Sequence, residues 1–267
     1  MTASHRALVL EELQDGLLTV VLNRPDRRNA LNSELCAQLV DALERAAASS
    51  EVRAVLVKGA GGTFCVGGDV KAMAQSEGPE VGVDERVRQL RARMEASRLL
   101  HDMAKPTVAA IGGAAAGAGL ALALACDLRV AGESAKITTA FAKVGLSGDF
   151  GGTYFMTRLI GSARARELYM TSPILAARQA LELGLVTRVV ADDQVDAAGA
   201  ELARSLADGP TLTLGHMKHN LNLAEHAALG ECLDNEAWRH ILCMTTADHR
   251  EAATAFVEKR AARFTGK

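Results

Sequence analysis

The chain has 267 residues, of which 49% are apolar and 23% are charged, as in an ordinary globular protein. Basic and acidic side chains nearly cancel, with a formal net charge of −2 at pH 7, so no overall positive field would attract nucleic acid or an anionic membrane. Aromatic residues make up only 3%, which argues against stacking platforms for single-stranded nucleic acid.

No membrane or export segment is evident in the sequence. The polar N-terminus lacks the apolar core of a signal peptide, and the longest apolar stretch, residues 114–126, is shorter than the roughly 20 residues that a membrane helix needs. The five cysteines are widely spaced and form no C-x-x-C pair, and the histidines form no H-E-x-x-H motif. We therefore expect a cytoplasmic protein with free thiols, no metal and no redox cofactor.

The first half of the chain alternates β-branched runs with helical stretches, which predicts an α/β fold. Strands are expected at Leu17–Leu22, 53–58, Thr107–Ile111 and 128–130. Helices are expected at 32–48, where Asn32 can cap the first turn, at 84–103 and at 114–126. The strand–helix–strand order suggests the right-handed stacked turns of a spiral.

Strand patterns stop near residue 191, and only helical periodicity follows. The helices expected there span residues 195–206, 212–229, 231–244 and 248–263. We therefore expect two units, a core of residues 1–191 and a helical C-terminal subdomain of residues 192–267.

Two glycine-rich stretches, residues 61–71 and 112–119, each follow an expected strand. Glycine lets a ligand approach the backbone closely, and the second stretch runs into a helix whose first N–H groups carry partial positive charge. No G-x-x-x-x-G-K-[ST] motif occurs, and Leu122 replaces the third glycine of a G-x-G-x-x-G motif starting at Gly117. The residues alone leave two interpretations open, an anion-binding cradle or tight turns with close helix packing.

Five stretches of the chain form a recognisable set. They are NRPDRRNALN at 23–32, FCVGGDVKAM at 64–73, GAAAGAGLALALACDLRVAGESAK at 113–136, GGTYFMTRLIG at 151–161 and the tail EAATAFVEKRAARF. Together they resemble the crotonase superfamily of enoyl-CoA hydratases and isomerases. They cover nearly the whole chain in the order of the family. The resemblance implies a spiral of stacked ββα turns, a C-terminal helical region that forms a homotrimer or dimer of trimers, and a coenzyme A thioester as the substrate.

The resemblance also implies an oxyanion hole made by the backbone N–H groups of Gly68 and Ala118. Removing a proton beside a thioester carbonyl places charge on its oxygen, and a preorganised donor contributes about 2.7 to 4 kcal/mol there. The expected substrate and CoA contacts are Arg28, Ala30, Val66, Gly67, Asp69, Val70, Lys71, Phe141, Tyr154 and Lys259. A solvated turn is an alternative for Arg28. Capping or an internal ion pair is the role that the residues alone favour for both Asp69 and Asp127.

The two glutamates that the resemblance places in hydratases are replaced by Ala121 and Phe141. Hydration needs one group to activate water and another to protonate carbon, so the ordinary hydratase mechanism is in doubt. Asp149 remains, and its segment resembles the 1,2-epoxyphenylacetyl-CoA isomerase branch, in which an aspartate at this place is the acid/base. We expect Phe150 and Tyr154 to shield Asp149 from water and raise its pKa.

The sequence therefore favours an enoyl-CoA isomerase of fatty-acid metabolism or phenylacetate catabolism. Asp149 would move a proton at C2 or C4 while Gly68 and Ala118 hold the dienolate. Helix N-capping is the alternative role of Asp149. Three other functions stay open: an enoyl-CoA hydratase that uses Asp149 with water, a thioester hydrolase, and a non-catalytic acyl-CoA-binding protein.

Overall fold

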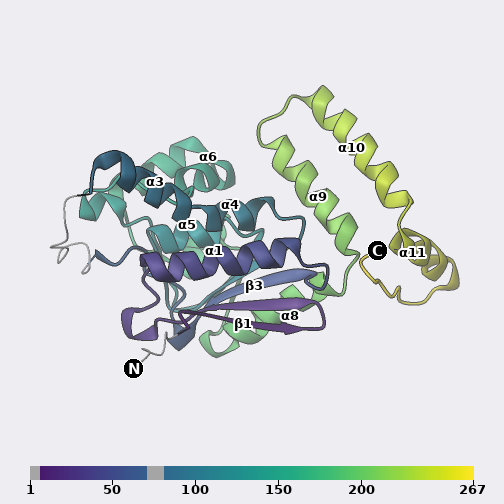
Figure 1. Ribbon diagram of the computed structural model, residues 1–267, viewed down its shortest axis with the longest axis horizontal. Coiled ribbons are helices and arrows are strands. Elements are labelled where there is room, and N and C mark those ends of the chain that lie inside the picture. The colour runs from purple at the N-terminus through teal and green to yellow at the C-terminus, as the bar shows by residue number, and fades with distance from the viewer. Residues whose placement is uncertain (1–6, 71–80) are drawn as a thin grey trace.

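The computed structural model describes residues 7–70 and 81–267 (Figure 1). A six-stranded sheet has the order β1-β2-β3-β4-β6-β9, in which only the β1–β2 pair is antiparallel. Its strands are β1 Val9–Gln14, β2 Leu17–Leu22, β3 Ala54–Gly59, β4 Thr107–Ile111, β6 Leu128–Gly132 and β9 Arg188–Val190. A second sheet consists of β5 Ala114–Ala116, β7 Lys136–Thr138 and β8 Leu175–Ala176. The mostly parallel sheet confirms the α/β prediction.

Helices cover both faces of the large sheet. The helices of the core are α1 Ser33–Ala48, α3 Val83–Arg93, α4 Glu95–Asp102, α5 Ala118–Leu124, α6 Gly152–Thr171, α7 Ala177–Glu182 and α8 Val195–Ala207. Successive side chains of a strand point to opposite faces, and β3 illustrates the result. Val55 and Val57 lie in the main hydrophobic cluster with α1, whereas Ala54 and Leu56 lie in a second cluster with α8.

Several elements follow the sequence prediction closely. Strands β2 and β4 have the expected bounds, and the Asn32 side chain caps α1 by accepting a hydrogen bond from the Leu35 amide at 2.9 Å. The prediction of one helix over 114–126 is wrong at its start. Residues Ala114–Ala116 form β5 because they pair with β7, and α5 begins only at Ala118.

The C-terminal region contains one helix that packs on the sheet and three that extend beyond it. Helix α8 lies against β3, β4 and β6, whereas α9 Thr211–Ala224, α10 Leu229–Met244 and α11 Ala247–Glu258 project from the core (Figure 1). The expected subdomain of residues 192–267 thus includes both kinds of helix. No helix within residues 7–70 and 81–267 is long and apolar enough to cross a membrane.

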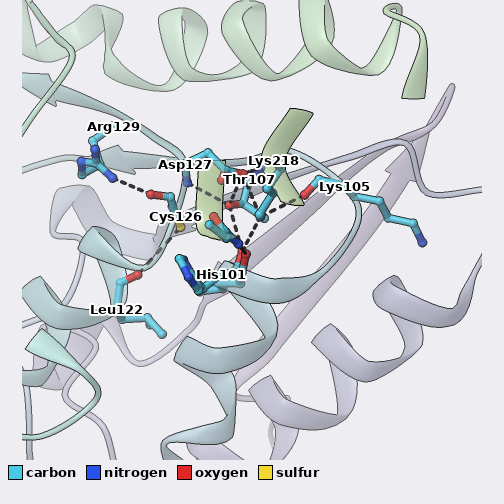
Figure 2. A network of polar contacts seen from close by, with 10 residues as sticks. His101, Lys105, Thr107, Leu122, Cys126, Asp127, Arg129 and Lys218 are labelled. Atoms are coloured by element: carbon cyan, nitrogen blue, oxygen red, sulfur yellow. Dashed lines mark hydrogen bonds and ion pairs between the residues drawn. The ribbon is translucent and has the colours of Figure 1, made fainter. Parts of the chain in front are cut away.

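An ion pair between a buried lysine and a half-buried aspartate attaches α9 to the core (Figure 2). The Lys218 ammonium group donates to Asp127 Oδ2 at 2.9 Å, to the Leu100 carbonyl at 2.7 Å and to the Lys105 carbonyl at 3.3 Å. The same Asp127 oxygen accepts hydrogen bonds from the Thr107 amide and hydroxyl groups at 2.7 and 2.9 Å. The expected internal ion pair of Asp127 is confirmed, and it joins α9 to the loop that follows α5.

Candidate active site

The two glycine-rich segments lie side by side. Their backbones form three hydrogen bonds, from Phe64 N to Gly112 O at 2.9 Å, from Cys65 N to Ala114 O at 3.1 Å and from Ala116 N to Cys65 O at 3.0 Å. This strand-like pairing fixes the loop after β3 against the start of α5. Residues that are far apart in the sequence thereby form one backbone surface.

This surface leaves two backbone donors open. Neither the Gly68 N–H nor the Ala118 N–H donates a hydrogen bond to any residue that the structure describes, and Ala118 begins α5, where amides have no partner within the helix. The two segments approach each other closely at Gly67, whose φ is 88°. A Cβ there would lie 2.7 Å from the Ala116 carbonyl oxygen and 3.3 Å from the Ala118 nitrogen. The arrangement can therefore present two N–H groups to one anionic atom.

The loop before α1 is fastened to the first glycine segment. The buried Asn29 side chain accepts from the Arg24 amide at 2.9 Å and donates to the carbonyls of Ala60 and Thr63 at 2.9 and 2.7 Å. Arg24 also forms an ion pair with Asp69 at 3.1 Å. The structure therefore confirms an internal ion pair for Asp69. That pair ties the loop containing Gly68 to the loop before α1.

The remaining residues expected to contact CoA differ in exposure and in their place in the fold. Arg28 is exposed at φ 50°, and its carbonyl accepts from the Val66 amide at 3.3 Å. Ala30 is buried, and Val70 is 47% exposed. Lys259 lies at the end of α11, apart from the glycine segments (Figure 1). Lys71 lies outside the described residues.

Asp149 lies half-buried in the loop before α6. Burial raises the pKa of its carboxyl group from 3.8 to about 6, and its Oδ1 atom is buried without a hydrogen-bond partner among the described residues. The N-cap interpretation is wrong, because Gly151 occupies the N-cap position at φ 75° and no side chain caps the helix. The expectation of a raised pKa is confirmed. Phe150, next in the chain, is buried.

An aromatic pair links this loop to the start of α5. The rings of Phe141 and Tyr169 stack with centroids 5.9 Å apart and planes 13° apart. A Cβ at Gly117 would lie 3.7 Å from the Phe141 ring, and a Cβ at Gly148 would lie 3.0 Å from the Tyr169 ring. The pair therefore lies between the segment carrying Ala118 and the loop carrying Asp149.

Tyr154 has a different setting from the one predicted. Its hydroxyl donates to Glu225, the C-cap of α9, at 2.7 Å, and the Arg158 guanidinium lies 3.6 Å from the centre of its ring. The side chain thus interacts with α9, and Tyr169 supplies the aromatic contact to the Asp149 loop. Tyr169 is absent from the predicted site residues. The lone Gly161 within a helical stretch marks a break in the helix, but not the direction in which the chain turns.

A sequence profile described as Enoyl-CoA hydratase/isomerase matches residues 12–267. The chain belongs to the enoyl-CoA hydratase/isomerase family. It is therefore an acyl-CoA enzyme of the crotonase superfamily, and the resemblance noted in its sequence is confirmed.

Relatives in this family carry both isomerase and hydratase names. The 1,2-epoxyphenylacetyl-CoA isomerase of Escherichia coli (strain K12) is 38% identical over 262 residues, which are 97% of this chain and 98% of that protein. The 2,3-dehydroadipyl-CoA hydratase of the same organism is 34% identical, covering 95% of this chain and 97% of its own.

Solved structures of the family have the same fold. The enoyl-CoA hydratase from Bacillus anthracis superposes with a TM-score of 0.90 at 28% identity, covering 97% of this chain and all of its own. The enoyl-CoA hydratase from Polaromonas sp. JS666 gives a TM-score of 0.89 at 29% identity, covering 96% of this chain and 99% of its own. The predicted crotonase-like spiral is thus confirmed.

Proposed function

We propose that this protein isomerises an enoyl-CoA ester by moving a proton between C2 and C4 of the acyl chain. Asp149 carries the proton, and the amides of Gly68 and Ala118 stabilise the negative charge on the thioester oxygen. The observation that carries the proposal is the Asp149 carboxyl group, which is half-buried and accepts no hydrogen bond within the described part of the chain.

The raised pKa suits a group that both takes and returns a proton. With a pKa of about 6, the Asp149 carboxylate is mostly charged at neutral pH and can act as a base. The conjugate acid that it forms is still strong enough to return the proton to carbon. An aspartate with the ordinary value of 3.8 would be a weaker base.

The dienolate formed in between needs stabilisation at its oxygen. The open N–H groups of Gly68 and Ala118 supply it without side-chain chemistry, and each preorganised donor of this kind is worth about 2.7 to 4 kcal/mol. The ion pair of Arg24 with Asp69 and the close approach of Gly67 to Ala116 support the proposal, because they hold these amides in place before substrate binds.

Isomerisation is favoured over hydration by the two replaced glutamates. Neither Ala121 nor Phe141 can transfer a proton, and the Phe141 ring is stacked on Tyr169. A proton shift needs one shuttling group, whereas hydration needs water activation and protonation of carbon. The isomerase name of a relative that is 38% identical agrees with this preference.

Hydration of an enoyl-CoA is the second candidate. It is favoured by relatives that carry hydratase names, among them one that is 34% identical over 95% of this chain. In that case Asp149 would activate a water molecule for attack at C3. A role in phenylacetate catabolism or fatty-acid metabolism, a cytoplasmic location and the contacts of Arg28, Lys71 and Lys259 with CoA stay predictions.

The two candidates are separated by supplying a 3-enoyl-CoA and a 2-enoyl-CoA to the purified protein. The proposal expects the absorbance of the conjugated thioester to rise with the 3-enoyl substrate and to stay constant with the 2-enoyl substrate. A fall with the 2-enoyl substrate, as water adds, favours the hydratase. Tight binding without deuterium exchange at C2 or C4 and without release of free CoA would indicate a non-catalytic acyl-CoA-binding protein.

A further inference from the structure

Helix α6 is kinked, and its second half folds back on its beginning. Gly161 breaks the helix with φ 77° and ψ 160°. In a straight helix residues 152 and 169 would be separated by about 25 Å. Instead, a Cβ at Gly152 would lie 2.3 Å from the Tyr169 hydroxyl oxygen. The kink therefore places the Tyr169 hydroxyl at the loop from which α6 starts.

Tyr169 contacts this loop on both sides of Asp149. A Cβ at Gly148 would lie 3.0 Å from the Tyr169 ring and 3.7 Å from its hydroxyl oxygen, so the glycines at 148 and 152 both leave room for this side chain. Phe141 stacks on the ring and fixes its plane. The Tyr169 hydroxyl forms no hydrogen bond with any residue in the described ranges, and neither does the carboxyl group of Asp149.

We propose that Tyr169 is a positioning residue for Asp149, whose hydroxyl group stabilises the charged carboxylate and holds it toward the substrate. This inference rests on the proposed function. A phenol donates one hydrogen bond, and a donor near a carboxylate favours the charged form. Burial and the charge of Asp149 both raise the pKa of Tyr169, so its hydroxyl keeps the proton that it donates.

Other groups packed against the loop do not take this role. Helix α1 contributes Cys36, which couples electrostatically to Asp149 and Arg93, and burial raises the pKa of its thiol to about 11. A neutral thiol is a weak hydrogen-bond donor. The 3-10 helix η3 (Phe141–Val144) contributes the uncharged Phe141, and α5 contributes the methyl group of Ala121. Of these described groups, Tyr169 is the one whose hydroxyl can donate a full-strength hydrogen bond.

The kinetic test uses Tyr169→Phe, which removes the hydroxyl and keeps the stacked ring. Without the donor the charged carboxylate is less stable, so the pKa of Asp149 rises further. In the pH profile of kcat/KM, the fall on the acid side (the acid limb) should move to higher pH by about one unit, with KM changed less than twofold. Gly152→Ala should move the limb in the same direction, because its methyl group displaces the hydroxyl. If the acid limbs of both variants coincide with that of the wild type, the inference is wrong.

A second measurement does not depend on activity. The chain has only two tyrosines, so labelling their Cζ atoms with ¹³C gives two NMR signals. The Tyr169 signal should titrate with a midpoint of about 6 and lose this transition in Asp149→Asn, while the Tyr154 signal, from a hydroxyl bonded to Glu225, serves as the internal reference. If the chemical shift of Tyr169 does not follow the titration of Asp149, the inference is wrong and the proposed function still stands. A coupled signal in a protein without isomerase activity rejects the proposed function and the positioning role that rests on it.

Discussion

At the scale of single residues, the burial of Asp149 favours proton transfer but lowers the stability of the folded protein. Burial raises the pKa of its carboxyl group to about 6 because the charged form has lost much of its hydration. The same loss makes the folded protein less stable whenever the group is charged. Function and stability are therefore opposed at this side chain.

Asp149→Asn should consequently abolish turnover and stabilise the fold at neutral pH. The pKa is higher in the folded state than the ordinary 3.8, so the folding cost is complete above pH 6 and absent below about pH 4. We expect the free energy of unfolding to rise by about 1 to 2 kcal/mol at pH 7. Urea denaturation at pH 7 and pH 4 measures this difference. An equal change at both pH values contradicts the assigned burial of charge.

At the scale of elements, the backbone at Gly67 fixes the distance between the loop after β3 and the start of α5. Its φ of 88° favours glycine, and a Cβ would collide with the Ala116 carbonyl oxygen. Gly67→Ala should separate the Gly68 and Ala118 amides and lower kcat at least tenfold, with a smaller change in KM.

Gly62→Ala is the matched control for this variant. Gly62 has a similar φ of 73°, but a Cβ there meets nothing within 4 Å. Both variants carry the same left-handed strain, and only Gly67→Ala closes the space at the amides. If the two variants lose activity equally, the amides at 68 and 118 are not the groups that matter.

Helix α9 is held by the pair of the buried Lys218 with the half-buried Asp127. Lys218→Met should lower the free energy of unfolding by about 3 kcal/mol, because the Asp127 carboxylate is left without its cation. The control is Lys58→Met, whose ion pair with Asp196 is shorter, 2.6 Å against 2.9 Å, but exposed. Its loss should cost less than about 1 kcal/mol. Chemical denaturation of both variants tests whether burial, rather than distance, decides the contribution.

At the scale of the whole molecule, the projecting helices expose large apolar side chains, including Leu221, Leu229, Trp238 and Phe256. Such a surface fits a protein that associates with copies of itself. We expect a homotrimer, so sedimentation should give about three times the chain mass of 28.1 kDa. Sedimentation as a monomer over the micromolar range would contradict this expectation.

The sequence predicted the fold better than it predicted the site. Strands β2 and β4 are runs of apolar residues with one threonine each, and the Asn32 cap is a local signal, so these features were predictable. Strand β5 was missed because alanine favours helices, and only its pairing with β7 makes it a strand. Tyr169 was missed because its place beside Asp149 depends on the reversal at Gly161, which no local pattern encodes.

The same limit applies to Asp149. An aspartate just before a helix usually caps it, so a capping role and a catalytic role had similar support from the sequence. The left-handed residues Phe150 and Gly151 decide between them, because they turn the chain so that Gly151 takes the cap position. The sequence does not reveal those dihedral angles.

Exchange of substrate protons for deuterium tests the central claim most directly. A 3-enoyl-CoA in deuterated water is incubated with the wild type and with Asp149→Asn, and the acyl chain is analysed by mass spectrometry. We predict deuterium at C2 or C4 and a conjugated product with the wild type, and neither with Asp149→Asn, although the variant still binds the ester. Exchange at an undiminished rate in Asp149→Asn would contradict the assignment of Asp149 as the proton carrier.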